Sequence, residues 1–212
     1  MIREMCAAIF DLDGVIVDTA KYHYLAWKRL AHSLGFDFTE VDNERLKGVS
    51  RGRSLEILLE IGGLDLDDET KAQMAARKNE WYMDYIRQLD AGEILPGATE
   101  YLKAIRSRGV RTALASASKN APLILERLGI SALFDVVVDG NKVNNAKPDP
   151  EVFLRAAEEL GIPPASCVVF EDAEAGIEAA LRAGMGAVGI GSPFRLKDAD
   201  VVIGGLWQLV VL

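Results

Sequence analysis

Two pairs of acidic residues stand close together in this sequence, each directly after a short apolar run. They are Asp11 with Asp13, and Glu171 with Asp172. Two aspartates separated by one residue point to the same side if they leave a strand, because side chains alternate along a strand. Several carboxylates at one point repel each other and raise each other's pKa unless a cation joins them. Oxygen donors without His or Cys suit Mg²⁺ better than zinc.

Two further groups would turn such a cluster into a site for phosphoryl transfer. Lys147 adds a positive charge. Ser116, together with backbone N–H groups at the start of the following helix, can hold phosphate oxygens. Mg²⁺, a lysine, a hydroxyl and a carboxylate nucleophile together make a phosphoryl-transfer site.

Each feature taken alone has an ordinary explanation. The aspartates suit loops or caps, the lysine a solvated loop, the serine a helix cap, and the acidic pair the start of a helix. Their joint occurrence at the ends of four successive predicted strands favours the chemical interpretation.

The elements that would position these groups are short buried strands that alternate with helices. Continuous apolar runs suit strands covered on both faces. Helix patterns cover Glu100–Arg108 and Glu151–Leu160, and Asp149-Pro150 predicts a capping residue followed by a proline in the first turn. The alternation predicts an α/β fold with a doubly wound, Rossmann-like parallel sheet, whose sites form beyond the carboxyl ends of the strands. The predicted strands are Ala7–Phe10, Arg111–Ala115, Val136–Val138, Val168–Phe170 and Ala187–Ile190.

The connection between the first two strands is too long for this pattern, and helices fill it. An apolar stripe from Trp81 to Leu89 has helical spacing. We therefore predict a helical cap domain at residues 16–90, inserted into an α/β core of residues 1–15 and 91–212. Glycine and proline near residues 90–97 mark the return hinge. The predicted cap helices are Ala20–Leu34, Ser54–Ile61 and Thr70–Leu89.

Composition limits the class of protein. The chain has 212 residues, of which 50% are hydrophobic and 26% charged, enough to bury a core without disulfides. A net charge of −8 argues against a nucleic-acid partner. The first residues lack the apolar region of a signal peptide, and the apolar runs are too short for a membrane span. We interpret Cys6 and Cys167 as buried strand residues with free thiols, and expect a cytoplasmic protein with a small-molecule partner, with no need for more than a monomer.

The motifs resemble those of a known superfamily. The segment Phe10–Thr19, with the sequence FDLDGVIVDT, resembles the first motif of the haloacid dehalogenase superfamily of phosphotransferases. Ser116, Lys147 and the pair Glu171-Asp172 match its second, third and fourth motifs in the same order. The resemblance covers essentially the whole chain.

The resemblance implies a role for each acidic residue. Asp11 would be the nucleophile that becomes an aspartyl phosphate, and Asp13 the general acid and base. Mg²⁺ would be held by the Asp11 carboxylate, the Asp13 backbone carbonyl and Asp172, with Glu171 assisting.

The predicted cap resembles one group within that superfamily, the β-phosphoglucomutases. This resemblance implies interconversion of β-glucose 1-phosphate and β-glucose 6-phosphate through a β-glucose 1,6-bisphosphate intermediate. The bisphosphate must turn around between half-reactions, so its far end needs a clamp, for which Arg51 offers a bidentate guanidinium. The matching segments are Asp18–Ala20, Tyr22-His23, Trp27, Leu46–Arg51 and Arg77–Asn79 in the predicted cap, and Ala115–Asn120 in the core.

Several residues are candidates for binding the sugar phosphate. Closure of the cap would exclude water and bring the basic residues among them over the core. Trp27 is an ordinary core aromatic in the alternative interpretation, and Lys78 an ordinary helix-surface lysine. We assign His32 a structural or exposed role. The candidates are His23, Trp27, Lys47, Gly48, Val49, Arg51, Lys78, Ser118, Lys119 and Asn120.

Alternatives remain open at this point. Ala173 stands where relatives often carry serine, and Asp139–Asn145 differs in detail, although neither change removes a reacting group. A phosphatase of small phosphorylated sugars would share every core residue but pass the phosphoryl group to water. The segment from Lys47 to Arg51 favours a mutase. A sensor without catalysis is disfavoured by the complete acidic set, and a dehalogenase by Asp13.

Overall fold

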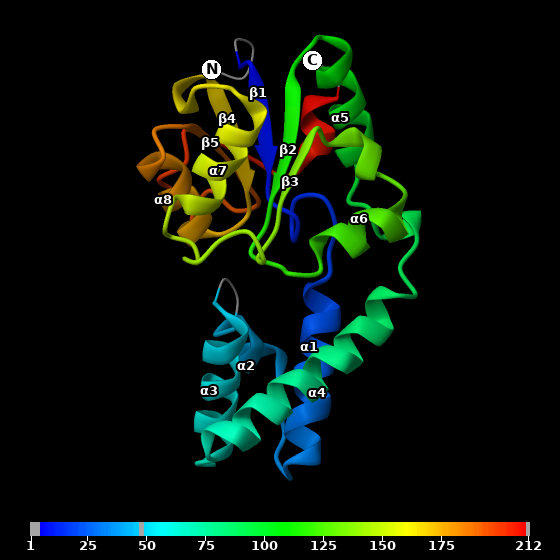
Figure 1. The fold of residues 1–212 in the computed structure, drawn as a ribbon, viewed down its shortest axis with the longest axis vertical. Coiled ribbons are helices and arrows are strands. Elements are labelled where there is room, and N and C mark those ends of the chain that lie inside the picture. Colours follow the sequence, from blue (N-terminus) through cyan, green and yellow to red (C-terminus); the bar gives the residue numbers. More distant parts are fainter. Residues whose placement is uncertain (1–4, 47–48, 211–212) are drawn as a thin grey trace. The chain divides into compact units, whose positions relative to one another are not determined.

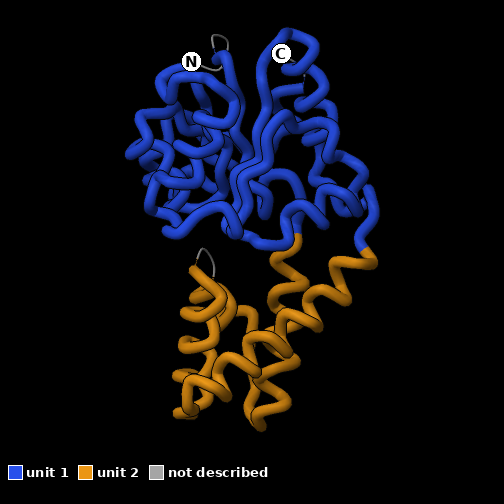
Figure 2. The backbone as a smooth tube through the Cα atoms, viewed as in Figure 1, with its two compact units in different colours: residues 1–18, 89–212 blue, residues 19–88 orange. Residues whose placement is uncertain are grey.

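A computed structural model describes residues 5–46 and 49–210. The chain forms two compact units, Met1–Asp18 with Leu89–Leu212, and Thr19–Gln88 (Figure 2). We call the first the α/β unit and the second the helical unit. The limits predicted at residues 15 and 91 differ from these by three and two residues.

Six parallel strands form the sheet of the α/β unit, in the order β3-β2-β1-β4-β5-β6 (Figure 1). The doubly wound parallel fold is confirmed, and all five predicted strands are present within one residue at each end. The sixth, β6, was not predicted. The strands are β1 Ala7–Phe10, β2 Arg111–Ala115, β3 Val136–Val138, β4 Cys167–Glu171, β5 Gly186–Ile190 and β6 Val201–Ile203.

Helices connect successive strands as far as β5, a loop leads on to β6, and four more helices lie in the described part of the helical unit. Pro150 occupies the N-cap position of α7 and not its first turn as predicted, and the side chain of Asp149 accepts a hydrogen bond from the N–H of Glu151 (3.0 Å). The helices of the α/β unit are α5 Ala98–Ser107, α6 Ala121–Leu128, α7 Glu151–Leu160 and α8 Glu174–Arg182. Those of the helical unit are α1 Ala20–Ser33, α2 Glu40–Glu44, α3 Arg51–Gly62 and α4 Asp68–Ile86.

The two faces of the sheet bury alternate residues of the same strands. Ile9 and Val169 belong to the core formed with α7 and α8. Phe10 and Phe170 point to the opposite face, where their rings stack at 4.7 Å and Tyr101 of α5 meets both edge-on. This alternation decides the direction in which the residues after each strand point.

The helical unit has an apolar core of its own. Trp27, Leu30 and Phe38 pack there against α3. Tyr82 and Ile86 of the predicted apolar stripe are fully buried. Asp67 caps α4 by accepting a hydrogen bond from the N–H of Thr70 (2.8 Å). The unit therefore has both a core and ordered helix ends.

One cysteine differs from the prediction. Cys167 is buried and Cys6 is exposed, and both are free thiols. Cys6 lies one residue before β1, whereas Cys167 is the first residue of β4. Among the described residues, no helix is long and apolar enough to cross a membrane.

Candidate active site

The register of the sheet places Asp11 beside Glu171. Phe10 and Phe170 are partners in the parallel pair of β1 and β4, and the N–H of Asp11 donates to the carbonyl of Phe170 (3.0 Å). Asp11 and Glu171 continue the alternation of Ile9 and Val169, so both leave their strands on the α7 side. Two carboxylates from distant parts of the sequence are thus brought together.

Lys147 joins these two carboxylates. Its Nζ donates to Oδ1 of Asp11 (2.5 Å) and to Oε1 of Glu171 (2.7 Å), and lies 3.4 Å from the carbonyl oxygen of Ala115. The Lys147 side chain is 9% exposed. Burial alone would lower its pKa, but the charges and hydrogen bonds of Asp11 and Glu171 outweigh burial and raise the pKa above its usual range. The ammonium therefore stays protonated at neutral pH.

Asp172 lies against the loop that follows β1. Gly14 has a φ of +75°, and a Cβ there would lie 2.3 Å from Oδ2 of Asp172. Only glycine allows this backbone conformation and this close approach. The carboxylate of Asp172 thereby meets the backbone next to Asp13. Burial raises the pKa of Asp172 to about 7, and the charges of Glu171 and Asp13 add to the effect.

The residues present suit Mg²⁺ if backbone oxygen takes part. Within residues 5–46 and 49–210, no group of three or more His, Cys, Asp or Glu side chains is arranged to hold a metal ion. Glu171 is engaged elsewhere, because Oε1 accepts from Lys147 and Oε2 accepts from the N–H of Ala173 (2.8 Å). Asp11 and Asp172 are therefore the carboxylates left for a metal ion, and the Asp13 carbonyl is the third donor that the resemblance implies.

Electrostatics favour a cation at this point. Burial raises the pKa of Asp11 well above its ordinary value. The charges of Glu171 and Asp172 raise it further, and the charge of Lys147 opposes them. One ammonium thus faces three crowded carboxylates, and a divalent ion would offset the remaining repulsion.

Ser116 shapes the loop between β2 and α6. It is buried at the end of β2, and its Oγ accepts a hydrogen bond from the N–H of Ser118 (3.1 Å). Oγ of Ser118 accepts in turn from the N–H of Asn120 (3.3 Å). These are the local bonds of a serine-capped turn, and they hold the candidate phosphate-binding residues in one ordered segment.

The loop after β3 braces this segment. The N–H of Gly140 donates to the carbonyl of Ser118 (3.2 Å), and the side-chain amide of Asn141 donates to the carbonyl of Lys119 (3.2 Å). A Cβ on Gly140 would lie 2.2 Å from the carbonyl oxygen of Ala117. The divergent segment Asp139–Asn145 thus contacts the candidate site directly.

Buried Lys78 and half-buried His23 form a pair inside the helical unit. Nζ of Lys78 lies 2.9 Å from Nδ1 of His23 and 4.4 Å from the centroid of the Trp27 ring. The His23 ring stacks on Tyr82 at 4.0 Å. Burial lowers the pKa of His23 well below its ordinary value, as do the charges of Lys78 and Arg51.

Burial changes the interpretation of two residues of this unit. Lys78 is 2% exposed, so its interpretation as an ordinary surface lysine is wrong. Trp27 is 3% exposed and belongs to the core, as in the alternative that the sequence left open. His32 is exposed and pairs with Asp37 (3.1 Å), as expected.

Arg51 is exposed at the first position of α3. Its Nη2 donates to Oδ1 of Asn79 (2.8 Å), which ties α3 to α4. Val49 is 40% exposed. Lys47 and Gly48 lie outside the described residues.

Two residues that were not predicted from the sequence interact with candidate site residues. Asn79 orients Arg51, and its place in the matched segment Arg77–Asn79 was a signal for it. Arg195, on the loop after β5, lowers the pKa of Asp172 through its charge. No motif or spacing in the sequence pointed to Arg195.

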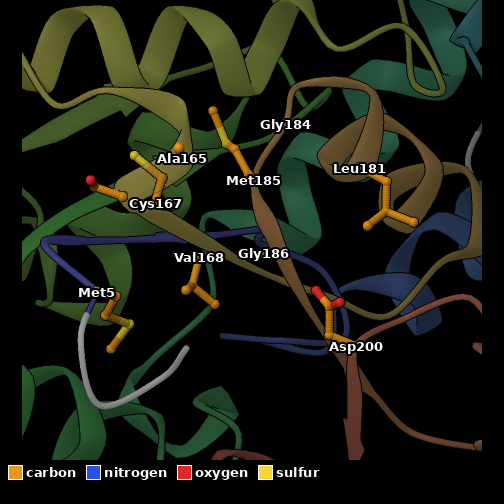
Figure 3. A pocket seen from close by; sticks show the side chains of 10 residues that line it. Met5, Ala165, Cys167, Val168, Leu181, Gly184, Met185, Gly186 and Asp200 are labelled. Atoms are coloured by element: carbon orange, nitrogen blue, oxygen red, sulfur yellow. The ribbon is translucent and has the colours of Figure 1, made fainter.

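A hollow of about 420 Å³ lies near the amino ends of β4 and β5, at the end of these strands opposite to Asp11 and Glu171 (Figure 3). Met5, Cys167 and Met185 line it, and it contains none of the predicted site residues. Its acidic residue, Asp200, accepts the N–H of Ala187 (2.8 Å) and so serves the sheet. The carboxyl edge, where the charges meet, is therefore the candidate active site.

Comparisons with known proteins find the superfamily that the sequence motifs resemble. A family model for haloacid dehalogenase-like hydrolases matches residues 5–184. A β-phosphoglucomutase of Bacillus subtilis is 45% identical over 201 residues, 94% of this chain and 89% of that protein. A phosphorylated carbohydrates phosphatase of Thermotoga maritima is 36% identical over 94% of this chain and 90% of its own length. The crystal structure of a β-phosphoglucomutase from Clostridium difficile has a TM-score of 0.91 at 45% identity, covering 97% of this chain and 93% of that one.

Proposed function

Because the chain belongs to the haloacid dehalogenase-like hydrolase family and is an enzyme, we propose that it moves a phosphoryl group within a sugar phosphate through an aspartyl phosphate on Asp11. The proposed reaction interconverts β-glucose 1-phosphate and β-glucose 6-phosphate, with β-glucose 1,6-bisphosphate as intermediate. The observation that carries the proposal is the Lys147 ammonium bound to both Asp11 and Glu171. The 45% identity to a β-phosphoglucomutase supports the choice of substrate.

In the first half-reaction Asp11 is the nucleophile. A carboxylate oxygen of Asp11 forms a bond to phosphorus of the bisphosphate while the bond from phosphorus to the sugar oxygen breaks. Asp13 donates its proton to that leaving oxygen. The products are a sugar monophosphate and phosphorylated Asp11.

In the second half-reaction the same groups work in reverse. A free hydroxyl of a sugar monophosphate attacks the aspartyl phosphate, Asp13 takes the hydroxyl proton, and the Asp11 carboxylate is regenerated. Lys147 offsets negative charge on the transferring group, and Ser116 holds its oxygens. When bound by Asp11, Asp172 and the Asp13 carbonyl, Mg²⁺ supplies further positive charge for the same purpose.

The other candidate residues would bind the rest of the substrate. We assign Arg51, which is exposed and oriented by Asn79, to the second phosphoryl group, together with Lys47. Gly48 and Val49 would approach sugar hydroxyls. Ser118, Lys119 and Asn120 would donate to phosphate oxygens from their ordered loop. Lys78 contacts His23 and Trp27 within the helical unit, and contact of these three residues with the sugar stays a prediction.

The test follows the fate of the phosphoryl group. Purified enzyme receives Mg²⁺, β-glucose 1-phosphate and a trace of β-glucose 1,6-bisphosphate, and glucose 6-phosphate and inorganic phosphate are measured together. We expect glucose 6-phosphate to form much faster than inorganic phosphate. Absence of glucose 6-phosphate would contradict the proposed mutase.

A phosphatase of small phosphorylated sugars is the second candidate. It is favoured by the relative of Thermotoga maritima, a phosphorylated carbohydrates phosphatase that matches 94% of this chain. In that case water would replace the sugar hydroxyl in the second half-reaction. Rapid release of inorganic phosphate without glucose 6-phosphate would favour it.

A further inference from the structure

The segment before Lys147 decides where its ammonium lies. A lysine has a flexible four-carbon stem, so the position of its charge depends on how firmly the backbone is held. Asn144 and Asn145 directly precede Ala146 and Lys147 in an irregular stretch between β3 and α7. The N–H groups of such a stretch need partners outside a helix or a sheet.

Glu151, the first residue of α7, provides those partners. The N–H of Asn144 donates to both carboxylate oxygens of Glu151 (3.1 Å each), and the N–H of Asn145 donates to Oε2 (2.8 Å). These backbone hydrogen bonds lower the pKa of Glu151, so its carboxylate is ionised at neutral pH. Hydrogen bonds to an ionised acceptor are stronger than neutral ones.

The residues after Lys147 are held as well. The Pro148 carbonyl accepts from Nη1 of Arg182 on α8 (3.0 Å), and the N–H of Glu151 donates to the Asp149 carboxylate (3.0 Å). Lys147 therefore lies between two anchored points.

An acidic residue in the first turn of a helix is often explained by the helix dipole. That explanation does not account for Glu151. Both of its oxygens face N–H groups of the preceding loop, six and seven residues earlier in the chain.

We propose that Glu151 is a positioning residue for phosphoryl transfer, which holds the backbone of Asn144 and Asn145 and so fixes the ammonium of Lys147 between Asp11 and Glu171. The inference rests on the proposed role of Lys147 in that transfer. Glu151 itself is not a catalytic residue, because it acts through the loop.

The test compares three variants. Glu151→Ala removes all three hydrogen bonds, Glu151→Gln keeps the size and one acceptor oxygen, and Glu158→Ala removes the same charge from an exposed site on the same helix. A displacement of about 1 Å at a reacting group costs up to about 10²-fold in rate. We expect kcat to fall roughly 10- to 100-fold in Glu151→Ala and less in Glu151→Gln, with KM within about twofold. Glu158→Ala should match the wild type.

A second measurement separates positioning from general destabilisation. The amide proton signals of Asn144 and Asn145 report the charged acceptor directly, and they should move upfield in Glu151→Gln but not in Glu158→Ala. If these signals move while kcat stays at the wild-type value, the proposal is overturned and the proposed function stands. If Glu158→Ala lowers kcat as much as Glu151→Ala, the proposal is also overturned.

Failure of the proposed function has a different signature. In that case the wild type itself turns over no sugar phosphate and forms no phosphoryl adduct with acetyl phosphate, and the positioning role falls with it. Should Glu151→Ala fail to fold, the comparison of Glu151→Gln with wild type provides the same decision.

Discussion

At the scale of single residues, the candidate site concentrates charges that burial makes costly. Lys147, Asp11 and Glu171 are each almost buried and satisfy one another. Removing one partner of a buried ion pair leaves the other charge without compensation, which costs about 3–5 kcal/mol. The net contribution of these three residues to the stability of the fold therefore depends on all three being present.

Lys147→Ala should reduce the stability of the metal-free protein. We expect the free energy of unfolding to fall by about 3–5 kcal/mol, because two buried carboxylates lose their cation. Urea denaturation measures it. Lys142→Ala is the control, since Lys142 forms a more exposed pair with Glu159 (2.8 Å), for which about 0–1 kcal/mol is expected. Equal losses in the two variants would contradict this account.

The roles of Asp11 and Asp13 should be distinguishable with phosphoryl donors that have different leaving groups. Asp11→Asn lacks the nucleophile, so we expect no turnover and no phosphoryl adduct with any donor. Asp13→Asn loses acid–base catalysis, which lowers kcat for sugar phosphates by about 10²- to 10⁴-fold. It should still form the adduct from acetyl phosphate, whose leaving group needs no proton. Intact-mass spectrometry checks both, and an adduct on Asp11→Asn would refute the assignment.

Gly14→Ala should disturb the metal-binding carboxylate. Its Cβ would lie 2.3 Å from Oδ2 of Asp172, so Asp172 must move. Displacing groups that orient a metal ligand typically costs 10- to 100-fold, so we expect Mg²⁺ activation to require roughly tenfold more Mg²⁺ or above. Gly35→Ala has a similar positive φ with open space around it, and it should leave the Mg²⁺ dependence unchanged.

At the scale of elements, the local signals were sufficient for every strand except the edge strand β6. The apolar runs of β1 and β2 are buried, that of β3 at the other edge is half-buried, and all three agree with the predicted bounds. The edge strand β6 has three residues between Asp200 and Gly204, so its apolar run is too short to be distinguished from a loop. Its pairing with β5 depends on tertiary structure that no local pattern contains.

The site was predictable where motifs exist and not where long-range contacts decide. The motifs predicted Asp11 and Glu171 at strand ends, where the parallel register of β1 and β4 joins them, and Lys147 beyond the third strand, from where the loop before α7 brings it to both. The burial of Lys78 depends on how α4 packs on α1, which periodicity does not specify. Glu151 looked like an ordinary first-turn acid because its partners are backbone groups of a loop.

The helical unit should lose stability in acid through His23. Its pKa is lowered well below 6.5 in the folded state, so below about pH 6.5 the unfolded chain binds a proton there that the folded chain does not. This contribution is complete above pH 6.5 and decreases as the pH falls. Urea midpoints at pH 7.5, 6.5 and 5.5 measure it. His23→Gln should flatten the slope and His32→Gln should not; equal slopes in all three proteins would contradict it.

At the scale of the whole molecule, the proposed metal donors all belong to one unit. Asp11, Asp13 and Asp172 lie in the α/β unit, although the helical unit separates the first two from the third along the chain. Metal chemistry and recognition of the second phosphoryl group are thus assigned to different units.

Binding of Mg²⁺ without sugar phosphate should therefore protect only the α/β unit. Backbone hydrogen exchange around residues 11–14 and 171–173 should be slower in the presence of Mg²⁺ than in the presence of a chelator, because those backbone groups surround the donors. Residues 19–88 should be unchanged. Equal protection of both units would show that the donor set is incomplete as assigned.

The position of β1 in the sheet has a consequence for biosynthesis. β1 is made first, yet its neighbours β2 and β4 begin at residues 111 and 167. The helical unit ends at residue 88 and has its own core. It can therefore fold during synthesis, before β2 and β4 have been made and can pair with the two edges of β1. Ala7–Phe10 therefore lacks its second neighbour until Cys167–Glu171 has been made, and Asp11 cannot meet Glu171 before then.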